Sequence, residues 1–287
     1  YILILREEEQ WTLKLFLNSD KFSEKHKKYF DVYDEIFKDF INKKITFVEV
    51  GILNGGSLEI WRKYFGSNAR IIGIDFNPEC KKFEKDGIEI FIGDQSDPEF
   101  WDNFFNKVGQ VDILLDDGGH TNLQQIITTI KSVKNINDGG LLVVEDTHTS
   151  YMPEFGNPNK KSYINFSKKI IDDINYTFPG LEKFKYSLNK YIYSIKYFES
   201  FVVYYIDRKK TYVNSKIENK SQNFAPIKDF RYKNSTLSKL VNNNSLLKKI
   251  KFLKKYKLVT YLYEGIIKIL RFFDIKKESK KYEKYFK

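Results

Sequence analysis

Carboxylates follow the apolar runs of this chain at the points where each run ends. The stretch "VDILLDDGGH" places two acids and one of the three histidines, His120, directly after an apolar run, and "VVEDTH" repeats the pattern with His148. A single acid at such a point can equally well be a ligand-binding residue or a solubilising loop residue. Five acidic ends on one rim would accumulate like charge unless bound ligands or a metal balance it. The acids concerned are Glu49, Asp75, Asp94, Asp116 with Asp117, and Glu145 with Asp146.

The first of these ends carries a glycine loop, "EVGILNGGS". Gly51, Gly55 and Gly56 allow the backbone to turn sharply and to approach a ligand closely, and Ser57 opens the next helix. The spacing is G-x-x-x-G-G, whereas a dinucleotide fingerprint has G-x-G-x-x-G. The loop alone is therefore weak evidence for any one ligand.

The next two ends narrow the choice of ligand. Asp75 can accept hydrogen bonds from both hydroxyls of a ribose, and Asp94, in "GDQSD", can accept one from the exocyclic amine of adenine. Together with the glycine loop they describe an adenosine site whose loop faces a group other than phosphate.

Alternating strands and helices are expected to position these ends, because ligands bind at the carboxyl ends of strands in open α/β sheets. Short apolar runs separated by helical segments are typical of a parallel sheet covered on both faces. The segment Tyr191–Ile206 holds two apolar runs with almost no connection, so these strands must be antiparallel. The expected strands are Ile45–Val50, Arg70–Ile74, Ile88–Ile92, Val111–Leu115 and Leu141–Val144, and the expected helices are Ser57–Phe65, Pro78–Lys85, Pro98–Val108 and Asn122–Ile136.

The predicted fold is therefore a Rossmann-like, doubly wound α/β fold with a mostly parallel seven-stranded sheet and a terminal antiparallel hairpin. One or two helices within Thr12–Asn42 precede it, and Ser23 can cap their start. A long loop, Glu145–Phe166, leaves the second acidic motif, and loops of this length are usually functional. The expected organisation is an N-terminal helical segment at 1–44, a central α/β domain at 45–207 and a basic, largely helical extension at 208–287.

At this point the motifs resemble a known family. "VEVGILNGGS", Asp75 and "GDQSD" look like the S-adenosyl-L-methionine motifs of class I methyltransferases. "DDGGH" and "VVEDTH" resemble, more narrowly, the metal-dependent sugar O-methyltransferases of the macrocin and mycinamicin type. The likeness covers roughly residues 12 to 206 and does not extend to the tail. It implies that 45–207 is a methyltransferase domain.

The resemblance implies a role for each residue of the rim. Asp117, Glu145 and Asp146 would bind a divalent cation, most plausibly Mg²⁺, and His120 would be the catalytic base that deprotonates a sugar hydroxyl acidified by the metal. Asp116 would support the metal site or contact the cofactor. His148 and Tyr151 are candidate substrate contacts. The implied cofactor-binding residues are Glu49, Gly51, Asn54, Gly55, Gly56, Ser57, Asp75, Asp94, Gln95 and Asp116.

Each histidine also has a simpler interpretation. His120 can cap the following helix, His148 can be an ordinary loop residue, and His26 is expected to be a solvated helix residue. Two other functional classes stay open: an O-methyltransferase of a small phenol, catechol or natural product, and a non-catalytic protein that binds S-adenosyl-L-methionine. The intact carboxylate set with His120 argues against the non-catalytic alternative.

The charge of the chain is divided unevenly. The segment Arg208–Lys287 holds 23 Lys and Arg against 6 Asp and Glu, whereas residues 1–207 hold 26 against 32. Within the basic tail, "SLLKKIKFLKKYKL" is typical of an amphipathic helix with Leu246, Ile250 and Leu253 on one face. This helix is expected to pack on the core or on a second subunit, with contact to an anionic glycan or membrane surface as the alternative. Nucleic-acid binding is disfavoured, because no recognised module is present.

Composition also bears on location and acceptor. The single cysteine, Cys80, excludes an internal disulfide and fits a reducing compartment. Glu264 and Lys268 interrupt the most apolar part of the tail, so no membrane span is expected. We expect a cytoplasmic protein, at most at the inner face of the membrane, although the start at Tyr1 leaves a cleaved export signal as an alternative. A saccharide or nucleotide-linked sugar is the expected acceptor, and the Lys- and Asn-rich composition favours sugars of capsule or lipopolysaccharide over those of an antibiotic.

Overall fold

A computed structural model describes residues 10–85, 87–155, 160–177, 185–219 and 257–286. The chain separates into two compact units, Tyr1–Lys216 and Ile217–Lys287. The domain boundaries expected at 44/45 and 207/208 stay predictions, although the N-terminal helices pack into the same core as the sheet.

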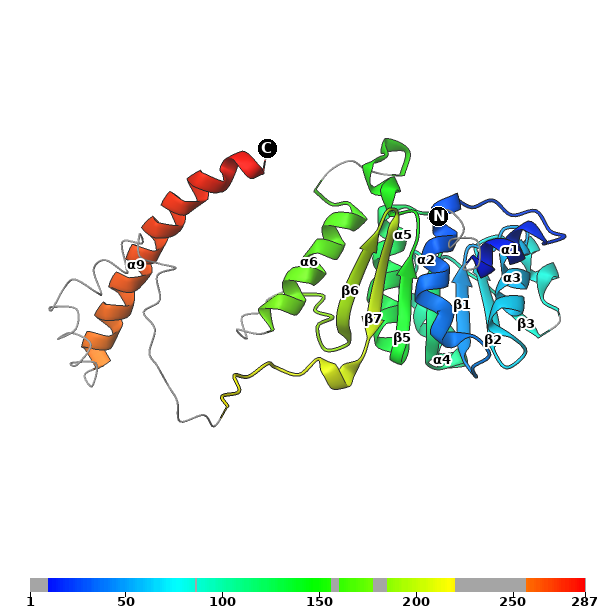
Figure 1. The fold of residues 1–287 in the computed structure, drawn as a ribbon, viewed down its shortest axis with the longest axis horizontal. Coiled ribbons are helices and arrows are strands. Elements are labelled where there is room, and N and C mark those ends of the chain that lie inside the picture. The colour runs from blue at the N-terminus through cyan, green and yellow to red at the C-terminus, as the bar shows by residue number, and fades with distance from the viewer. Residues whose placement is uncertain (1–9, 86, 156–159, 178–184, 220–256, 287) are drawn as a thin grey trace, which may run out of the picture. The chain divides into compact units, whose positions relative to one another are not determined.

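The first unit is built on a seven-stranded sheet with the order β3-β2-β1-β4-β5-β7-β6 (Figure 1). Strands β1 to β5 are parallel, and β7 pairs antiparallel with both β5 and β6. The predicted fold class is confirmed. The strand bounds are β1 Thr46–Val50, β2 Arg70–Asp75, β3 Ile88–Ile92, β4 Val111–Asp116, β5 Ile136–Val144, β6 Ile192–Phe198 and β7 Phe201–Ile206.

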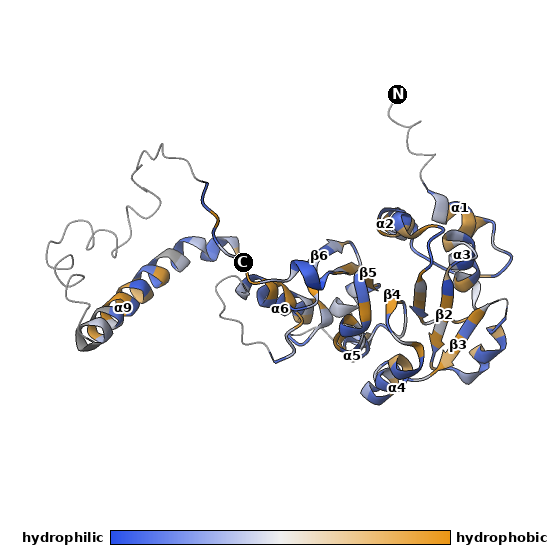
Figure 2. Ribbon diagram, turned by 90° about the horizontal axis from the view of Figure 1, so that it is seen from below, coloured by the Kyte–Doolittle hydropathy of each residue, from blue (hydrophilic) through white to orange (hydrophobic). Residues whose placement is uncertain are grey.

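Helices cover both faces of this sheet, and each face has its own apolar core. One core joins α1, α2 and α3 to the sheet, with aromatic residues such as Tyr33, Phe37 and Trp61 fully buried. The other joins α4, α5 and α6 to the opposite face through residues such as Trp101 and Tyr163. Figure 2 shows the hydrophobic residues gathered along the strands. The helix bounds are α1 Trp11–Leu17, α2 Lys27–Phe37, α3 Gly56–Phe65, α4 Pro98–Val108, α5 Asn122–Ser132 and α6 Tyr163–Tyr176, with short 3-10 turns at Lys38–Phe40, Pro78–Phe83, Val133–Asn135, Thr147–Tyr151, Pro153–Phe155 and Arg208–Lys210.

Several predicted boundaries were wrong for local reasons. Ser23 does not cap a helix, because the backbone stays extended until His26, the N-cap residue of α2. The segment after Pro78 forms a 3-10 helix, which Asn77 caps by accepting a hydrogen bond from the Glu79 N–H. Strand β5 begins five residues earlier than expected, across a register shift in its pairing with β4. The loop after the second acidic motif ends at Ser162, which caps α6.

The second unit contains one described α-helix, α9, at Lys257–Tyr282, followed by a 3-10 turn at Glu283–Tyr285. Many of its apolar side chains are exposed within the unit, including Leu262, Ile269 and Phe272. The predicted amphipathic face of Leu246, Ile250 and Leu253 lies outside the described residues. No helix in the described part of the chain is long and apolar enough to cross a membrane.

Candidate active site

The glycine loop lies where the strand order reverses, between β1 and β4. Gly51 has φ +83°, and a Cβ atom there would sit 2.1 Å from the carbonyl oxygen of Asp117. The Asp117 N–H donates to the Val50 carbonyl at 3.0 Å, so the loops after the two strands are in direct contact. Only glycine permits this approach, because a side chain would have to displace backbone. The loop therefore connects the two candidate binding regions.

A cavity of about 560 Å³ opens at this edge of the sheet. Four of the predicted cofactor residues line it: Gly51, Asp75, Asp94 and Gln95. Three predicted cation or base residues line it too: Asp117, His120 and Asp146. Among the described residues, the other predicted cofactor residues do not line this cavity; they are Glu49, Asn54, Gly55, Gly56, Ser57 and Asp116.

Asp75 organises the glycine loop. One of its oxygens accepts hydrogen bonds from the N–H groups of Ile52 and Leu53, at 3.0 and 3.2 Å, and the other accepts from Asn77 at 2.8 Å. Each carboxylate oxygen has two acceptor sites, so capacity for a ligand hydroxyl remains. Beside it Phe76, with 75% of its surface exposed, presents an aromatic ring to the cavity. The sequence reasoning missed Phe76 because aromatic residues are abundant throughout the chain.

The Glu49 side chain is buried and not exposed at the rim. Its carboxylate is fully buried and accepts hydrogen bonds from the Ser57 hydroxyl at 2.7 Å and the Trp61 indole at 3.0 Å. Burial raises the pKa of Glu49 to about 7. These bonds hold the start of α3 against β1. Glu49 and Ser57 therefore support the glycine loop without lining the cavity.

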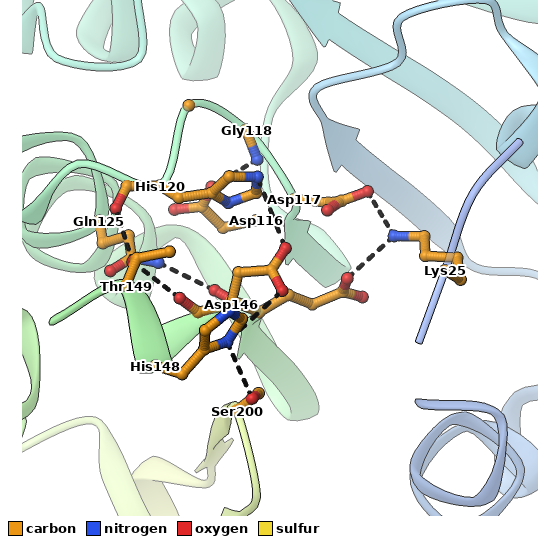
Figure 3. A network of polar contacts seen from close by, with 12 residues as sticks. Lys25, Asp116, Asp117, Gly118, His120, Gln125, Asp146, His148, Thr149 and Ser200 are labelled. Atoms are coloured by element: carbon orange, nitrogen blue, oxygen red, sulfur yellow. Dashed lines mark hydrogen bonds and ion pairs between the residues drawn. The ribbon is translucent and has the colours of Figure 1, made fainter. Parts of the chain in front are cut away.

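The acidic ends of β4 and β5 converge (Figure 3), and Asp117, His120 and Asp146 line the same cavity. Ligand atoms of Asp117, His120 and Asp146 all lie within 4.8 Å of one another, and His120 Nε2 is 3.5 Å from an Asp146 oxygen. Glu145, the third predicted cation ligand, is not part of this group. It is fully buried; one oxygen accepts from the Tyr33 hydroxyl at 2.5 Å and the other from the Lys25 ammonium at 2.9 Å.

Two of these residues have strained backbones. His120 has φ +59° and Asp146 has φ +53°, a region that non-glycine residues seldom adopt and that costs about 1–3 kcal/mol each. The Thr149 hydroxyl lies within hydrogen-bond distance of both of their carbonyl oxygens, at 2.9 and 2.8 Å. Thr121, and not His120, caps α5, through a reciprocal pair of hydrogen bonds with Gln124. The helix-capping alternative for His120 is thereby excluded.

Asp116 points into the protein, behind His120. Its carboxylate accepts a hydrogen bond from Gln95 Nε2 at 2.9 Å, and the Gln95 oxygen accepts from the Gly119 N–H at 2.8 Å. Within the described residues, its other oxygen and His120 Nδ1 are buried without a hydrogen-bond partner. Burial raises the pKa of Asp116, which a nearby His120 opposes. This placement makes Asp116 a support for the rim.

A second cavity, of about 760 Å³, meets the first at His26 and Tyr29, which line both. The predicted substrate contacts His148 and Tyr151 line it, and His148 Nδ1 is 2.9 Å from the Ser200 hydroxyl. His26, expected to be a solvated helix residue, is exposed but lies 5.8 Å from the His148 ring. The Tyr29 hydroxyl donates to Asp146, so α2 also contributes to the rim.

Sequence reasoning missed the contribution of the N-terminal segment. Lys25, Tyr29 and Tyr33 reach the carboxylates from positions 92 to 120 residues away in the chain. Local spacing carries no signal for such contacts.

Comparison with known proteins identifies sequence relatives. The chain is 34% identical over 131 residues to mycinamicin VI 2''-O-methyltransferase of Micromonospora griseorubida, a match that covers 43% of this chain and 32% of that protein. It is 30% identical over 157 residues to demethylmacrocin O-methyltransferase of Streptomyces fradiae, covering 50% and 39%. It is 29% identical over 158 residues to a rhamnosyl tetracenomycin-C 2'-O-methyltransferase of Streptomyces olivaceus, covering 52% and 41%. The matched part thus spans less than half the length of these relatives.

Solved structures agree with this grouping. The mycinamicin-pathway methyltransferase MycE, in complex with Mg, SAH and mycinamycin VI, superposes with a TM-score of 0.63 at 24% identity, covering 76% of this chain and 58% of that one. A second MycE structure, with Mg and SAH, gives 0.59 at 25% identity, covering 69% and 54%. No family model matches the sequence. The fold is that of a class I methyltransferase, and the resemblance predicted from the motifs is confirmed by these homologues.

Proposed function

We propose that this chain, a homologue of the macrocin- and mycinamicin-type sugar O-methyltransferases with the class I methyltransferase fold, transfers a methyl group from S-adenosyl-L-methionine to a sugar hydroxyl with the help of a divalent cation. The observation that carries the proposal is the convergence of Asp117, His120 and Asp146 on one wall of the cavity bordered by the glycine loop. Cofactor, base and cation ligands would thus share one space.

The cofactor would lie across the switch point of the sheet. Gly51 leaves room for close approach, Asp75 keeps an acceptor site for a ribose hydroxyl, and Phe76 offers a ring face to the adenine. Asp94 has one oxygen engaged by the Ser96 N–H and hydroxyl, at 2.7 Å each, which orients the carboxylate toward the cavity that it lines. The volume and the polar rim fit an adenosyl group. MycE, with the same fold, is described as a complex with SAH.

The donor set fits a hard divalent cation. Asp117 and Asp146 supply carboxylate oxygens within 4.8 Å of each other. Glu145 is adjacent, because its N–H donates to the Asp116 carbonyl oxygen at 2.9 Å. When bound, such a cation would lower the pKa of an acceptor hydroxyl toward neutrality. Mg²⁺ is the natural candidate because all donors are oxygens. The relatives' structures with Mg support this choice.

His120 is the proposed catalytic base. Its Nε2 faces Asp146 at 3.5 Å, so a hydroxyl held at the carboxylates would be within reach of the imidazole. His120 Nδ1 is buried beside Asp116, whose negative charge would stabilise the imidazolium that forms. The strained backbone of His120, held through Thr149, fixes the ring where the proton must be accepted.

The acceptor would enter through the second cavity, which adjoins Asp146 at Tyr29 and His26. Its lining combines aromatic rings, including Tyr151 and Tyr197, with polar groups such as His148 and Ser200. Aromatic faces suit the apolar faces of a sugar ring, and the polar groups suit its hydroxyls. Holding the acceptor there would bring its hydroxyl close to the methyl donor, which is a major part of the catalytic advantage.

The relatives favour a sugar attached to a natural product as the first acceptor to test, since their names describe macrolide and tetracenomycin glycosides. The surface polysaccharide expected from composition draws no support from them, and neither do membrane contact or oligomerisation. A phenol or catechol acceptor is the comparison that the assay must include.

Calorimetric titration of S-adenosyl-L-methionine and S-adenosylhomocysteine, with and without Mg²⁺, tests the cofactor site. Binding at micromolar concentration is expected. The absence of binding in both conditions would overturn the proposal.

Methyl transfer to a panel of glycosides and catechols, with and without Mg²⁺, tests the reaction. Asp117→Asn should remove cation-dependent turnover and leave cofactor binding largely intact, and His120→Ala should remove turnover with the cation still bound. Asp102→Asn is the matched control, because Asp102 pairs with Lys131 on the surface at 2.6 Å. Wild-type turnover in the Asp117 or His120 variant would refute that residue's role.

A further inference from the structure

A lysine contacts two of the three predicted cation ligands. The Lys25 ammonium contacts Asp117 and lies 2.9 Å from Glu145, and 8% of the side chain is exposed (Figure 3). The ammonium group thus lies between two acids that would also bind a metal.

This contact determines which carboxylates are available to bind a cation. Asp117 and Asp146 stand together as cation ligands, whereas both oxygens of Glu145 are engaged, by Lys25 and by the Tyr33 hydroxyl. An ammonium and a divalent cation repel each other, and they cannot both occupy contact distance from the same pair of carboxylates. Recruitment of Glu145 to a metal therefore requires that Lys25 withdraw.

Withdrawal of Lys25 would also change the cofactor cavity, which Lys25 lines. Lys25 belongs to the extended segment between α1 and α2, residues 18–26, whose Glu24, Lys25 and His26 line that cavity. The same segment passes over the start of α3, where a Cβ on Gly56 would sit 2.8 Å from the Phe22 carbonyl. Its other ionic anchor, Lys21 with Glu59 at 2.7 Å, lies on α3. Thus Lys25 ties this segment to the rim.

We propose that Lys25 is an internal counter-ion that a divalent cation must displace, so that cation binding detaches the segment 18–26 from the rim of the cofactor cavity. The inference rests on the proposed function, because it requires that Asp117 and Glu145 bind a metal. It assigns to Lys25 a role in setting cation affinity and in coupling the cation site to the segment beside the cofactor.

Calorimetric titration of Mn²⁺ into the full chain tests the competition. Lys25→Met keeps the length of the side chain and removes the charge, so the variant should bind Mn²⁺ at least tenfold more tightly than wild type. Its thermal midpoint should also rise more on addition of Mn²⁺, because its carboxylates lack a counter-ion without the metal. Lys25→Arg keeps the charge in a form that suits two carboxylates, and it should bind Mn²⁺ no more tightly than wild type. Lys28→Met is the matched control, since Lys28 pairs with Glu199 on the surface.

Hydrogen exchange of wild type supplies a readout that does not depend on a folded variant. Saturating Mn²⁺ should speed amide exchange in residues 18–26, while exchange in α2 stays unchanged. Equal or weaker Mn²⁺ binding by Lys25→Met, or unchanged exchange in 18–26 on Mn²⁺ binding, would overturn the inference and leave the metal site intact. If wild type and all variants fail to bind Mn²⁺, the metal site of the proposed function falls, and this inference falls with it.

Discussion

Replacement of Gly51 by alanine tests whether the glycine loop and the first acidic motif form one rigid junction. A Cβ atom at this position would sit 2.1 Å from the Asp117 carbonyl oxygen, and real Cβ contacts are essentially never under 3.0 Å. The two loops must therefore move apart by about 1 Å, because the obstructing atom is backbone and has no rotamer to change.

The chain offers a control at a glycine with the same φ. Gly109 also has φ +83°, but nothing lies within 4 Å of its virtual Cβ. A positive φ costs an alanine about 1–3 kcal/mol at either position. Gly51→Ala carries a further cost of about 1–3 kcal/mol for overpacking. In a unit of this size each kcal/mol lowers the thermal midpoint by roughly 2–4 °C. We expect Gly109→Ala to lose roughly 2–12 °C and Gly51→Ala about twice as much.

Function should separate the two variants further. A displacement of about 1 Å at a reacting centre can cost roughly 100-fold in rate, so Gly51→Ala should lose most methyl transfer and bind S-adenosylhomocysteine more weakly. Gly109→Ala should keep wild-type binding and turnover. The assays are thermal unfolding, calorimetry and methyl transfer on the same preparations. If both variants lose equal stability and keep equal cofactor affinity, the argument from close approach is refuted.

Three further substitutions probe the supports of the site. Tyr33→Phe should destabilise the fold by about 1.5–3 kcal/mol, because a buried Glu145 oxygen loses its donor; an unchanged urea midpoint would contradict this. Thr121→Ala should cost about 1 kcal/mol through loss of the capping pair with Gln124, and circular dichroism melting should show a fall of roughly 2–4 °C. Burial raises the pKa of Glu49 from 4.5 to about 7. The folded state thus keeps a proton that the unfolded chain loses in this range, so the free energy of unfolding should fall by about 3 kcal/mol as pH rises across it. Urea unfolding of Glu49→Gln should lack this part of the slope, and an identical slope in both proteins would count against the assignment.

The sheet was predictable because each strand carries its own signal. Continuous apolar runs such as Val111–Leu115 marked the parallel strands, and the absence of a connection within Tyr191–Ile206 required an antiparallel pair. Where a boundary depended on tertiary context, prediction failed. The early start of β5 runs through Asn137–Gly140, which has no strand-like composition, and it is held by pairing across a register shift.

The rim was predictable only in part. Parallel strands end at one edge, so the sequence placed Asp75, Asp94, Asp117 and Asp146 together, and all four line one cavity. The exposure of each acidic side chain could not be predicted in the same way. Glu49 carries the same residue type at the same kind of strand end, yet it is fully buried against α3. Contacts from the N-terminal segment, such as that of Lys25, depend on how distant elements pack. The hydrophobic periodicity of the sequence does not predict them.

The hairpin of β6 and β7, at the edge of the sheet, contributes residues to the second cavity. Its turn, Glu199–Ser200, lies beside the second cavity; the Ser200 carbonyl accepts from the Thr147 N–H at 3.1 Å, and its hydroxyl meets His148. Strands β6 and β7 are otherwise remote from the glycine loop in the sheet order. Residues added to or removed from this turn would thus alter the second cavity, which we propose to receive the acceptor. Under the proposed function, the length and sequence of this two-residue turn would therefore influence which acceptors the second cavity admits.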